Sequence, residues 1–343
     1  MRWKMGSEHF VIIGNGVAAN RAADILRDGD PHSRITMISR EFFPFYFRHK
    51  LRFFISEELG EDQLVVRPPS HYREQNIRLR LGQEVQRVDL QEKTLYLKHM
   101  EKVHYTRLLL CSGGWPRIPE IHYPYRQHFT ILKGLSHARG FREQISGVDR
   151  VLMVGGDLVS LKITETLLDM GREVLFMIDR DSFWPLTLTD DIRDGFAERL
   201  SKQGAEVITD DEITGIEKGE SGYEVMTRHD RMISCDLVGA FFGLVPNVDF
   251  LFSSGLDIDR GILVDDHLQA SDPDVWAAGD CAQIWNPAIN NYWVSIGWEN
   301  ARILGEVAAR NMLGESATAG APKESALEYE GIKVNTSWWQ IYD

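Results

Sequence analysis

The sequence predicts an α/β protein in which a strand, a glycine-bearing turn, a helix and a second strand occur in this order twice. The first copy starts with the apolar run 10–13, typical of a buried strand, and continues through an alanine-rich helix to the strand 34–38. The second copy starts with the apolar run 151–154 and reaches its second strand at 173–178. Because short strands and turns follow both copies, we interpret the pattern as an internal duplication of a nucleotide-binding fold.

The first turn carries the pattern G-x-G-x-x-A in residues 14–19. Gly14 permits a tight turn, Gly16 lets the backbone approach a pyrophosphate, and Ala19 lets the helix pack close to the strand. The phosphates then lie at the N-terminus of the helix, where peptide N–H groups point outward. A preceding strand and a following helix and strand therefore indicate a dinucleotide site.

The strand 34–38 is followed by Ser39, Arg40 and Glu41. Dinucleotide folds place an acidic residue here to bind ribose hydroxyls. Glu41 is the better candidate, Ser39 is a substitute, and the alternative for Glu41 is a solvated loop carboxylate. Arg48 and Lys50 follow in an aromatic segment, and they offer positive charge for a phosphate or an anionic ring. The alternative for this aromatic segment is a place in the core.

Two further glycine turns follow predicted strands. The strand 108–111 leads to Ser112 and Gly113, whose turn permits backbone contact with a bound group. The strand 275–278 ends at Gly279 and Asp280. The carboxylate of Asp280 is placed either to bind cofactor hydroxyls or to cap a helix.

Composition narrows the class of protein. A net charge of −13 argues against nucleic acid as a partner, because few cations are available to neutralise phosphates. We find no signal peptide and no apolar run of membrane-spanning length, and we therefore expect a cytoplasmic protein. The three cysteines, Cys111, Cys235 and Cys281, lie far apart. This spacing predicts no metal site and no dithiol, and favours three small buried side chains.

The order of these motifs resembles the FAD-dependent pyridine nucleotide-disulfide oxidoreductases, in the branch of rubredoxin reductases, NADH oxidases and nitrite reductase flavin domains. The likeness runs from residue 10 to residue 314 and includes Phe-Tyr-x-Arg at 45–48, Gly-Leu-Val-Pro-Asn at 243–247 and Ala-Ala-Gly-Asp-Cys-Ala at 277–282. It implies two Rossmann-like domains of three-layer ββα type, the second inserted in the first. The implied segments are 1–120 and 243–330 for FAD, 121–242 for a domain resembling an NAD(P)H-binding domain, and 331–343 for an aromatic tail.

The resemblance implies a role for each FAD-site residue. The first glycine turn holds the pyrophosphate, Glu41 the adenosine ribose and Asp280 the ribityl chain, while Val85 contacts the adenine and Arg48 lies near the flavin or its phosphates. A helix starting near Gly297 directs its positive end at the flavin. Arg48 and Lys50 are also the predicted catalytic residues, by stabilising reduced flavin. The full FAD set is Gly14, Asn15, Gly16, Val17, Ala18, Ser39, Arg40, Glu41, Arg48, Val85, Cys111, Ser112, Gly113, Gly279, Asp280, Gly297 and Trp298.

The second glycine turn departs from the family pattern G-G-G-x-x-G-x-E. The predicted NAD site consists of Gly155, Gly156 and, at the end of the next strand, Asp179, which favours NADH over NADPH by repelling a 2′-phosphate. Asp157, however, adds bulk and negative charge where the backbone meets the pyrophosphate. Lys162 stands where the family pattern has its glutamate. Its positive charge attracts phosphate and so partly compensates for Asp157.

Two absences separate this chain from some relatives. The segment directly after Arg48 contains no cysteine, so the family members that reduce peroxides or coenzyme A disulfides with a single cysteine there are poor guides. The chain ends at residue 343, where relatives enter a dimerisation domain, and we expect that domain to be lacking. The tail carries Trp338, Trp339 and Tyr342, which form either an anchor for a partner or a flap over the chain's own core.

We therefore expect an FAD-dependent oxidoreductase that passes electrons between NAD(H) and a redox protein or partner subunit, with hydride transfer at flavin N5. The alternative is an FAD-binding electron-transfer subunit of a larger redox complex, whose own NAD(P)H site is silent. The cofactor supplies the chemistry in both cases, and the protein supplies orientation and electrostatics.

Overall fold

The computed structural model describes residues 8–178, 182–183, 188–287, 290–294, 297–320 and 326–335. Asp179, predicted to select NADH, lies outside these described residues. The aromatic residues Trp338, Trp339 and Tyr342 of the tail also lie outside them.

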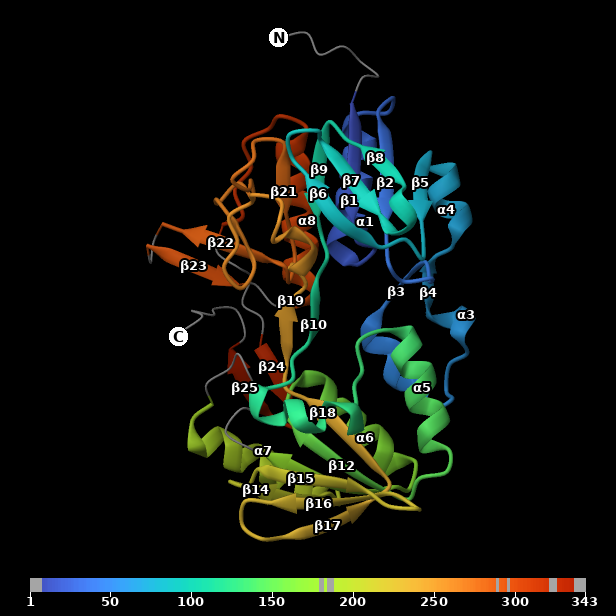
Figure 1. The fold of residues 1–343 in the computed structure, drawn as a ribbon, viewed down its shortest axis with the longest axis vertical. Helices are drawn as coiled ribbons and strands as arrows, with labels where there is room; N and C mark the ends of the chain where they lie inside the picture. The colour runs from blue at the N-terminus through green and yellow to red at the C-terminus, as the bar shows by residue number, and fades with distance from the viewer. Residues whose placement is uncertain are drawn as a thin grey trace.

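The first sheet is parallel and has the strand order β21-β9-β1-β2-β5. Its central strand β1 is almost entirely buried, as its continuous apolar sequence predicts for a sheet covered on both faces. The antiparallel strands β6, β7 and β8 form a separate small sheet beside it (Figure 1). The strands are β1(His9–Ile13), β2(Arg34–Ile38), β5(Ile77–Arg80), β6(Val85–Asp89), β7(Thr94–Leu97), β8(Lys102–His104), β9(Arg107–Leu110) and β21(Val275–Ala277).

The second sheet repeats this architecture. Five parallel strands have the order β11-β18-β12-β13-β14, and a small antiparallel sheet of β15, β16 and β17 accompanies them. The predicted fold class of two Rossmann-like units is confirmed. The strands are β11(Phe129–Thr130), β12(Arg150–Gly155), β13(Glu173–Ile178), β14(Glu206–Thr209), β15(Ile213–Lys218), β16(Tyr223–Thr227), β17(Met232–Cys235) and β18(Leu237–Phe241).

The two units lie one above the other and are joined through β10(Gly114–Pro116) and β19(Leu244–Pro246), which pair antiparallel (Figure 1). Three smaller sheets complete the strands: β3(Phe45–Tyr46) with β4(Val65–Arg67); β20(Ile262–Val264), β22(Ala282–Asn286) and β23(Asn291–Val294); and β24(Ala326–Tyr329) with β25(Ile332–Asn335). The α-helices are α1(Val17–Gly29), α2(Leu51–Ile55), α3(Glu61–Leu64), α4(Pro69–Glu74), α5(Leu135–Ile145), α6(Leu158–Asp169), α7(Asp190–Lys202) and α8(Trp298–Met312), with short 3-10 turns at Arg48–Lys50, Lys98–Met100, Glu120–His128 and Asp249–Leu251.

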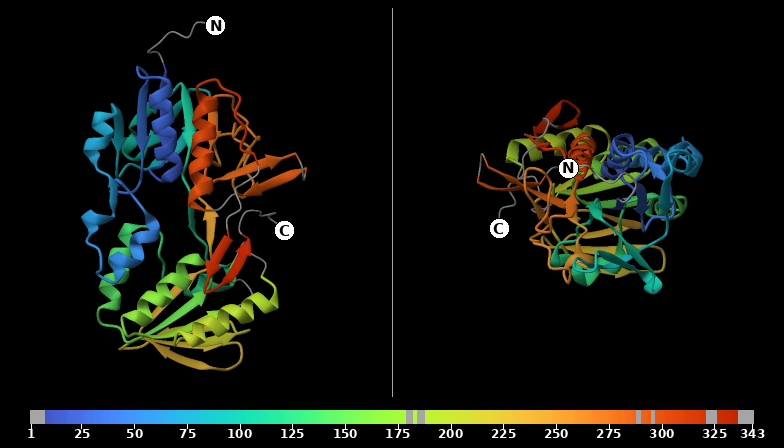
Figure 2. Two further views of the ribbon diagram at one scale, coloured as in Figure 1. Left: turned by 180° about the vertical axis from the view of Figure 1, so that it is seen from behind. Right: turned by 90° about the horizontal axis from the view of Figure 1, so that it is seen from above.

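Helices α1 and α8, from opposite ends of the sequence, lie side by side against the first sheet (Figure 2). Their close approach depends on small residues, since a Cβ at Gly305 would run into the backbone of Ala18. An ion pair of 2.6 Å between Arg21 and Glu306 joins the two helices at their surface. The C-terminal helix therefore closes the first unit, which begins at the N-terminus.

Part of the first predicted segment packs into the second unit. Leu51, Phe54 and Ile55 of α2 belong to the same buried cluster as Phe141 of α5 and Leu161 of α6. Residues 51–55 thus share a core with the segment predicted for NAD(P)H, although the sequence order groups them with 1–120. The exact domain boundaries stay a prediction.

The hairpin of β24 and β25 also packs on the second unit. Tyr329 is buried, and its ring lies 6.0 Å from that of Phe196 in α7. The guanidinium of Arg199 donates to the carbonyl of Glu330. Residues 326–335 are therefore folded back on the chain, and the predicted tail starts inside this hairpin.

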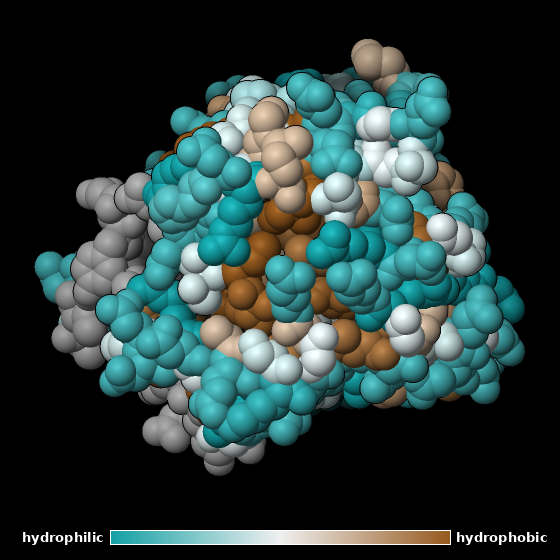
Figure 3. Space-filling view, turned by 90° about the horizontal axis from the view of Figure 1, so that it is seen from below, coloured by the Kyte–Doolittle hydropathy of each residue, from teal (hydrophilic) through white to brown (hydrophobic). Residues whose placement is uncertain are grey.

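The lower end of the molecule, below the second sheet, exposes an apolar area surrounded by hydrophilic side chains (Figure 3). Met226 and Met232, cross-strand neighbours in β16 and β17, are 36% and 63% exposed. Within the part of the chain that the structure describes, no helix is both long and apolar enough to cross a membrane.

Candidate functional site

A cavity of about 590 Å³ opens at the carboxyl ends of β1, β2, β9 and β21. Parallel strands bring the residues that follow them to this edge of the sheet, which is where such folds bind ligands. Every residue in the predicted FAD set lines the cavity. Lys50, the second predicted catalytic residue, does not line the cavity, and its ammonium lies 5.9 Å from the ring of Phe47.

The first glycine turn has the geometry that a phosphate-binding turn needs. Gly14 has φ of 125°, and a Cβ there would be forced into the carbonyl of Cys111. Gly16 caps helix α1 without any side-chain hydrogen bond, and α1 has no acidic residue in its first turn. The first N–H groups of α1 are thus left for an anion.

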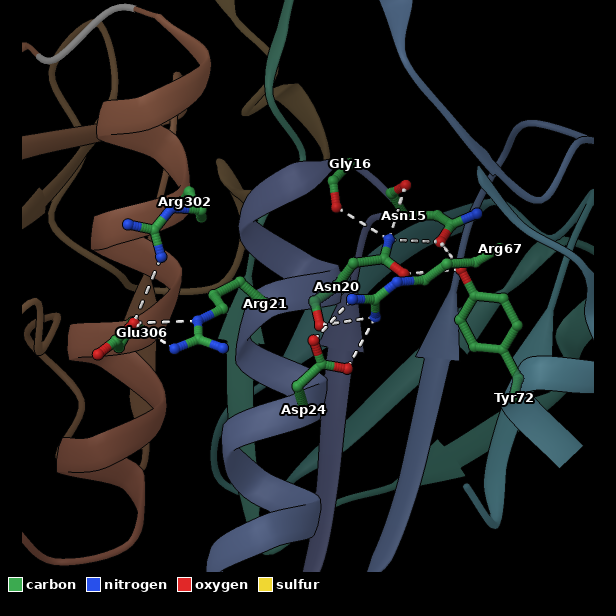
Figure 4. Close-up of polar contacts among 9 residues, drawn as sticks. All are labelled: Asn15, Gly16, Asn20, Arg21, Asp24, Arg67, Tyr72, Arg302 and Glu306. Carbon is green, nitrogen blue, oxygen red and sulfur yellow. Dashed lines mark hydrogen bonds and ion pairs between the residues drawn. The ribbon is translucent and has the colours of Figure 1, made fainter. Parts of the chain in front are cut away.

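A polar network supports this turn from the side (Figure 4). The amide nitrogen of Asn20 donates to the carbonyl of Gly16 at 3.0 Å and to both oxygens of Asn15, at 2.9 and 3.1 Å. The hydroxyl of Tyr72 donates to Oδ1 of Asn20 at 2.7 Å. Asn20 and Tyr72 are both buried. The network fixes the side chain of Asn15, the variable position of the glycine pattern, from residues that the sequence did not single out.

The structure joins two residues that were predicted to serve different parts of the cofactor. Arg48 donates to a carboxylate oxygen of Glu41 at 2.9 Å, and the hydroxyl of Tyr46 donates to the other at 2.9 Å. Burial lowers the pKa of the Arg48 guanidinium, but Glu41 and Tyr46 raise it more strongly. Glu41, Tyr46 and Arg48 therefore form one polar cluster in the wall of the cavity.

Lys133 also lines the cavity, and sequence reasoning missed it. Burial, together with the charge of Arg48, lowers the pKa of Lys133 to about 8, although Asp280, Glu41 and Asp157 act in the opposite direction. Arg48 donates to the carbonyl of Lys133 at 2.9 Å and so fixes this segment at the cavity. In the sequence, Lys133 follows two apolar residues and precedes a glycine, and this pattern does not indicate a binding site.

Two more predicted turns reach the same cavity. Gly279 has φ of 82° and precedes Asp280, while a Cβ at Gly279 would only touch Ala18 and Ala301. Gly297, with φ of 109°, caps α8 without a side-chain hydrogen bond. The N-termini of α1 and α8 therefore meet at one cavity.

The residues present fit FAD. The helix α1 offers uncapped N–H groups, and Asp280 and Glu41 offer carboxylates for hydroxyl groups. Among the described residues, the buried hydroxyl of Ser112 has no hydrogen-bond partner in the protein. FAD, when bound, supplies the ability to accept and return two electrons. The protein's own side chains would position the cofactor and place charge around it.

The second turn differs from the first in its N-cap. Gly155 has φ of 87° and fulfils the same backbone role as Gly14. Asp157 caps helix α6, and its Oδ1 accepts from the N–H of Ser160 at 2.7 Å. The residues Gly155 and Gly156 predicted for NAD are thus in a turn whose helix N-terminus is already occupied by a side chain.

A family profile described as "Pyridine nucleotide-disulphide oxidoreductase" matches residues 8–296. The chain belongs to this family. The predicted resemblance and the predicted oxidoreductase class are both confirmed, and FAD and NAD(H) are the cofactors of the family's flavoprotein reductases.

Among the relatives of this chain are reductases of redox proteins. The nitric oxide reductase FlRd-NAD(+) reductase of Klebsiella pneumoniae subsp. pneumoniae is 29% identical over 279 residues, which cover 81% of this chain and 73% of the relative. The protein of the same name from Shigella flexneri is 27% identical over 317 residues, covering 92% and 82%.

Solved structures share the fold. The covalent putidaredoxin reductase–putidaredoxin complex matches with a TM-score of 0.86 and 22% identity, covering 96% of this chain and 81% of that chain. The ferredoxin reductase for the CYP199A2 system from Rhodopseudomonas palustris matches with a TM-score of 0.84 and 23% identity, covering 93% and 80%.

Proposed function

We propose that this family member is an FAD-dependent oxidoreductase that passes electrons between NAD(H) and a small redox protein. The observation that carries the proposal is the convergence of the whole predicted FAD set on one cavity. The names of similar proteins support the type of partner. One relative is named as a reductase of flavorubredoxin, and one solved structure is a complex of a reductase with putidaredoxin.

The chain's own residues would act on the bound cofactor by position and charge. The open N-terminus of α1 would receive the pyrophosphate, and Arg48 and Lys133 would place positive charge on the same side of the cavity. Glu41 and Asp280 would accept hydrogen bonds from the hydroxyl groups. No acid or base is required from the protein when electrons move through a flavin.

A second function is favoured by one observation, the side-chain cap that Asp157 places on α6. In that case the chain is an electron-transfer subunit that binds FAD and receives electrons from another protein. We also propose a cytoplasmic location, because all three cysteines are buried and unpaired, as is usual in a reducing compartment. Docking through the tail remains a prediction, because residues 336–343 lie outside the described part.

An anaerobic titration of the purified holoprotein distinguishes the two functions. We expect NADH to bleach the visible flavin absorbance with one equivalent per FAD, and NADPH to act more slowly. Bleaching by dithionite but by neither nucleotide would favour the electron-transfer subunit. A protein that neither retains FAD nor takes it up would contradict both functions.

A further inference from the structure

The two glycine turns of this chain treat their helix N-termini in opposite ways. At the first turn, Gly16 leaves the N-terminus of α1 without a side-chain cap. At the second, the carboxylate of Asp157 accepts a hydrogen bond from the N–H of Ser160 at 2.7 Å, and the hydroxyl of Ser160 accepts one from the N–H of Asp157 at 2.8 Å. The backbone N–H of Val159 also points to this carboxylate. The donors that a pyrophosphate needs are thus used within the protein.

The second turn is also covered on its other side. The N–H of Phe183 donates to the carbonyl of Gly156 at 2.6 Å. The ring of Phe183 lies over Gly156, so that a Cβ added there would meet ring carbons at 2.6 to 2.9 Å. This ring is buried and stacks on Phe196 of α7 at 4.9 Å. The backbone surface of Gly156 is therefore in contact with protein.

Two of the described cations near the second turn, Lys162 and Arg52, share one carboxylate. Lys162 forms an ion pair of 2.7 Å with Glu165, and Arg52 lies 3.7 Å from the same carboxylate. The attraction of phosphate expected from Lys162 is reduced accordingly. The charge of Lys133 also interacts favourably with the carboxylate of Asp157.

We propose that Asp157 occupies the anion position of the second turn and thereby sets how weakly this chain binds NAD(H). The inference rests on the proposed function and makes Asp157 a determinant of nucleotide affinity, acting through its bulk and its charge. Asp157 does not itself line the flavin cavity, although its charge interacts favourably with that of Lys133, which does.

The test is the affinity of the FAD-loaded protein for NAD⁺, measured by isothermal titration calorimetry without turnover. Asp157→Gly restores the family residue, and Asp157→Ser keeps a good helix cap while removing the charge. We expect both variants to bind NAD⁺ about tenfold more tightly than the unchanged protein, or better. Asp169→Asn is the matched control, since it removes one carboxylate from the exposed far end of the same helix. Its affinity should equal that of the unchanged protein.

Equal or weaker binding of NAD⁺ by both folded variants would overturn the proposal. Circular dichroism and FAD content establish folding, and the serine variant decides alone if the glycine variant does not fold. The outcome is independent of electron transfer. A holoprotein that fails to reduce any redox protein would contradict the proposed function, whereas the affinities for NAD⁺ would still decide the role of Asp157.

Discussion

The hydroxyl of Tyr72 lies 2.7 Å from Oδ1 of Asn20, beside the first glycine turn (Figure 4). Tyr72 is in α4, and Asn20 is in the first turn of α1, so the bond ties two elements that are far apart in sequence. Burial raises the pKa of Tyr72 to about 12, which keeps the hydroxyl protonated and able to donate. The turn that would hold the pyrophosphate is thus fixed by a buried side chain.

Tyr72→Phe should weaken both the fold and FAD binding. The buried oxygen of Asn20 would lose its donor, which should cost about 1–2 kcal/mol of unfolding free energy. Urea denaturation of the apoprotein measures this loss, and fluorescence titration should show a several-fold weaker FAD affinity. Tyr105→Phe is the control, because Tyr105 is also buried and its hydroxyl has no partner among the described residues. An equal loss in both variants would contradict a specific role for Tyr72.

Gly16→Ala should separate folding from cofactor binding. Its φ of −82° suits alanine, and a Cβ there would meet no protein atom within 4 Å. The unfolding free energy should stay within about 0.5 kcal/mol of the original. FAD should bind at least about tenfold more weakly, since the methyl group would enter the space for the pyrophosphate. Gly140→Ala in α5 is the control, with open space around its Cβ and no contact with the cavity. Unchanged FAD affinity in Gly16→Ala would place the phosphates elsewhere.

The sequence allowed the fold, and a set of residues that lines one cavity, to be predicted because local patterns encode both. Gly14, Gly113 and Gly279 follow buried strands, and parallel pairing brings the ends of those strands to one edge. Long-range pairing has no such local pattern. The contact between Glu41 and Arg48, the approach of Lys133 and the packing of α2 on the second unit all depend on how distant segments meet.

The second turn shows the same limit in another form. The sequence shows that Asp157 stands where the family pattern has a glycine, but it does not show what its carboxylate contacts. Only the structure shows the hydrogen bond to Ser160, and only the structure brings the ring of Phe183 onto Gly156. The sequence likewise does not separate Arg48, which lines the cavity, from its near neighbour Lys50, which does not.

Arg27→Met should destabilise the protein strongly. The buried guanidinium of Arg27 donates to the carbonyl oxygens of five residues at 2.9 to 3.0 Å, and so joins the end of α1 to the segments before β2 and β5. Because these carbonyl oxygens lose their donor, the unfolding free energy should fall by about 3 kcal/mol or more. Arg34→Met, at an exposed position in β2, should change stability by less than about 0.5 kcal/mol. Chemical denaturation compares the two, and similar losses would contradict the role of Arg27.

Asp211→Asn should lower stability at neutral pH more than in acid. Burial raises the pKa of Asp211, but hydrogen bonds from Thr227, Glu212 and His229 together lower it by more. The folded pKa therefore lies below the usual value. The carboxylate therefore adds stability above the unfolded pKa, and this contribution is lost as pH falls through the folded pKa. We expect a loss of about 2 kcal/mol at pH 7, shrinking below pH of about 4. Asp210→Asn, at the exposed neighbour, is the control. A loss that does not depend on pH would show that charge is not the cause.

Lys133 should make FAD binding depend on pH near 8. Burial holds the pKa of its ammonium at about 8, so the lysine loses its charge as pH rises through this value. An anionic pyrophosphate in the cavity would favour the charged form and raise that pKa. By linkage, FAD binding then takes up a proton, and affinity should fall by up to about tenfold per pH unit above 8.

Two variants test the role of Lys133. Lys133→Arg keeps its charge and should bind FAD equally well from pH 7 to 9, whereas Lys133→Met should bind weakly throughout. Fluorescence titration across this range measures all three. The same fall in affinity for the arginine variant would assign the titration to another group, and equal affinity of the methionine variant would remove Lys133 from the site.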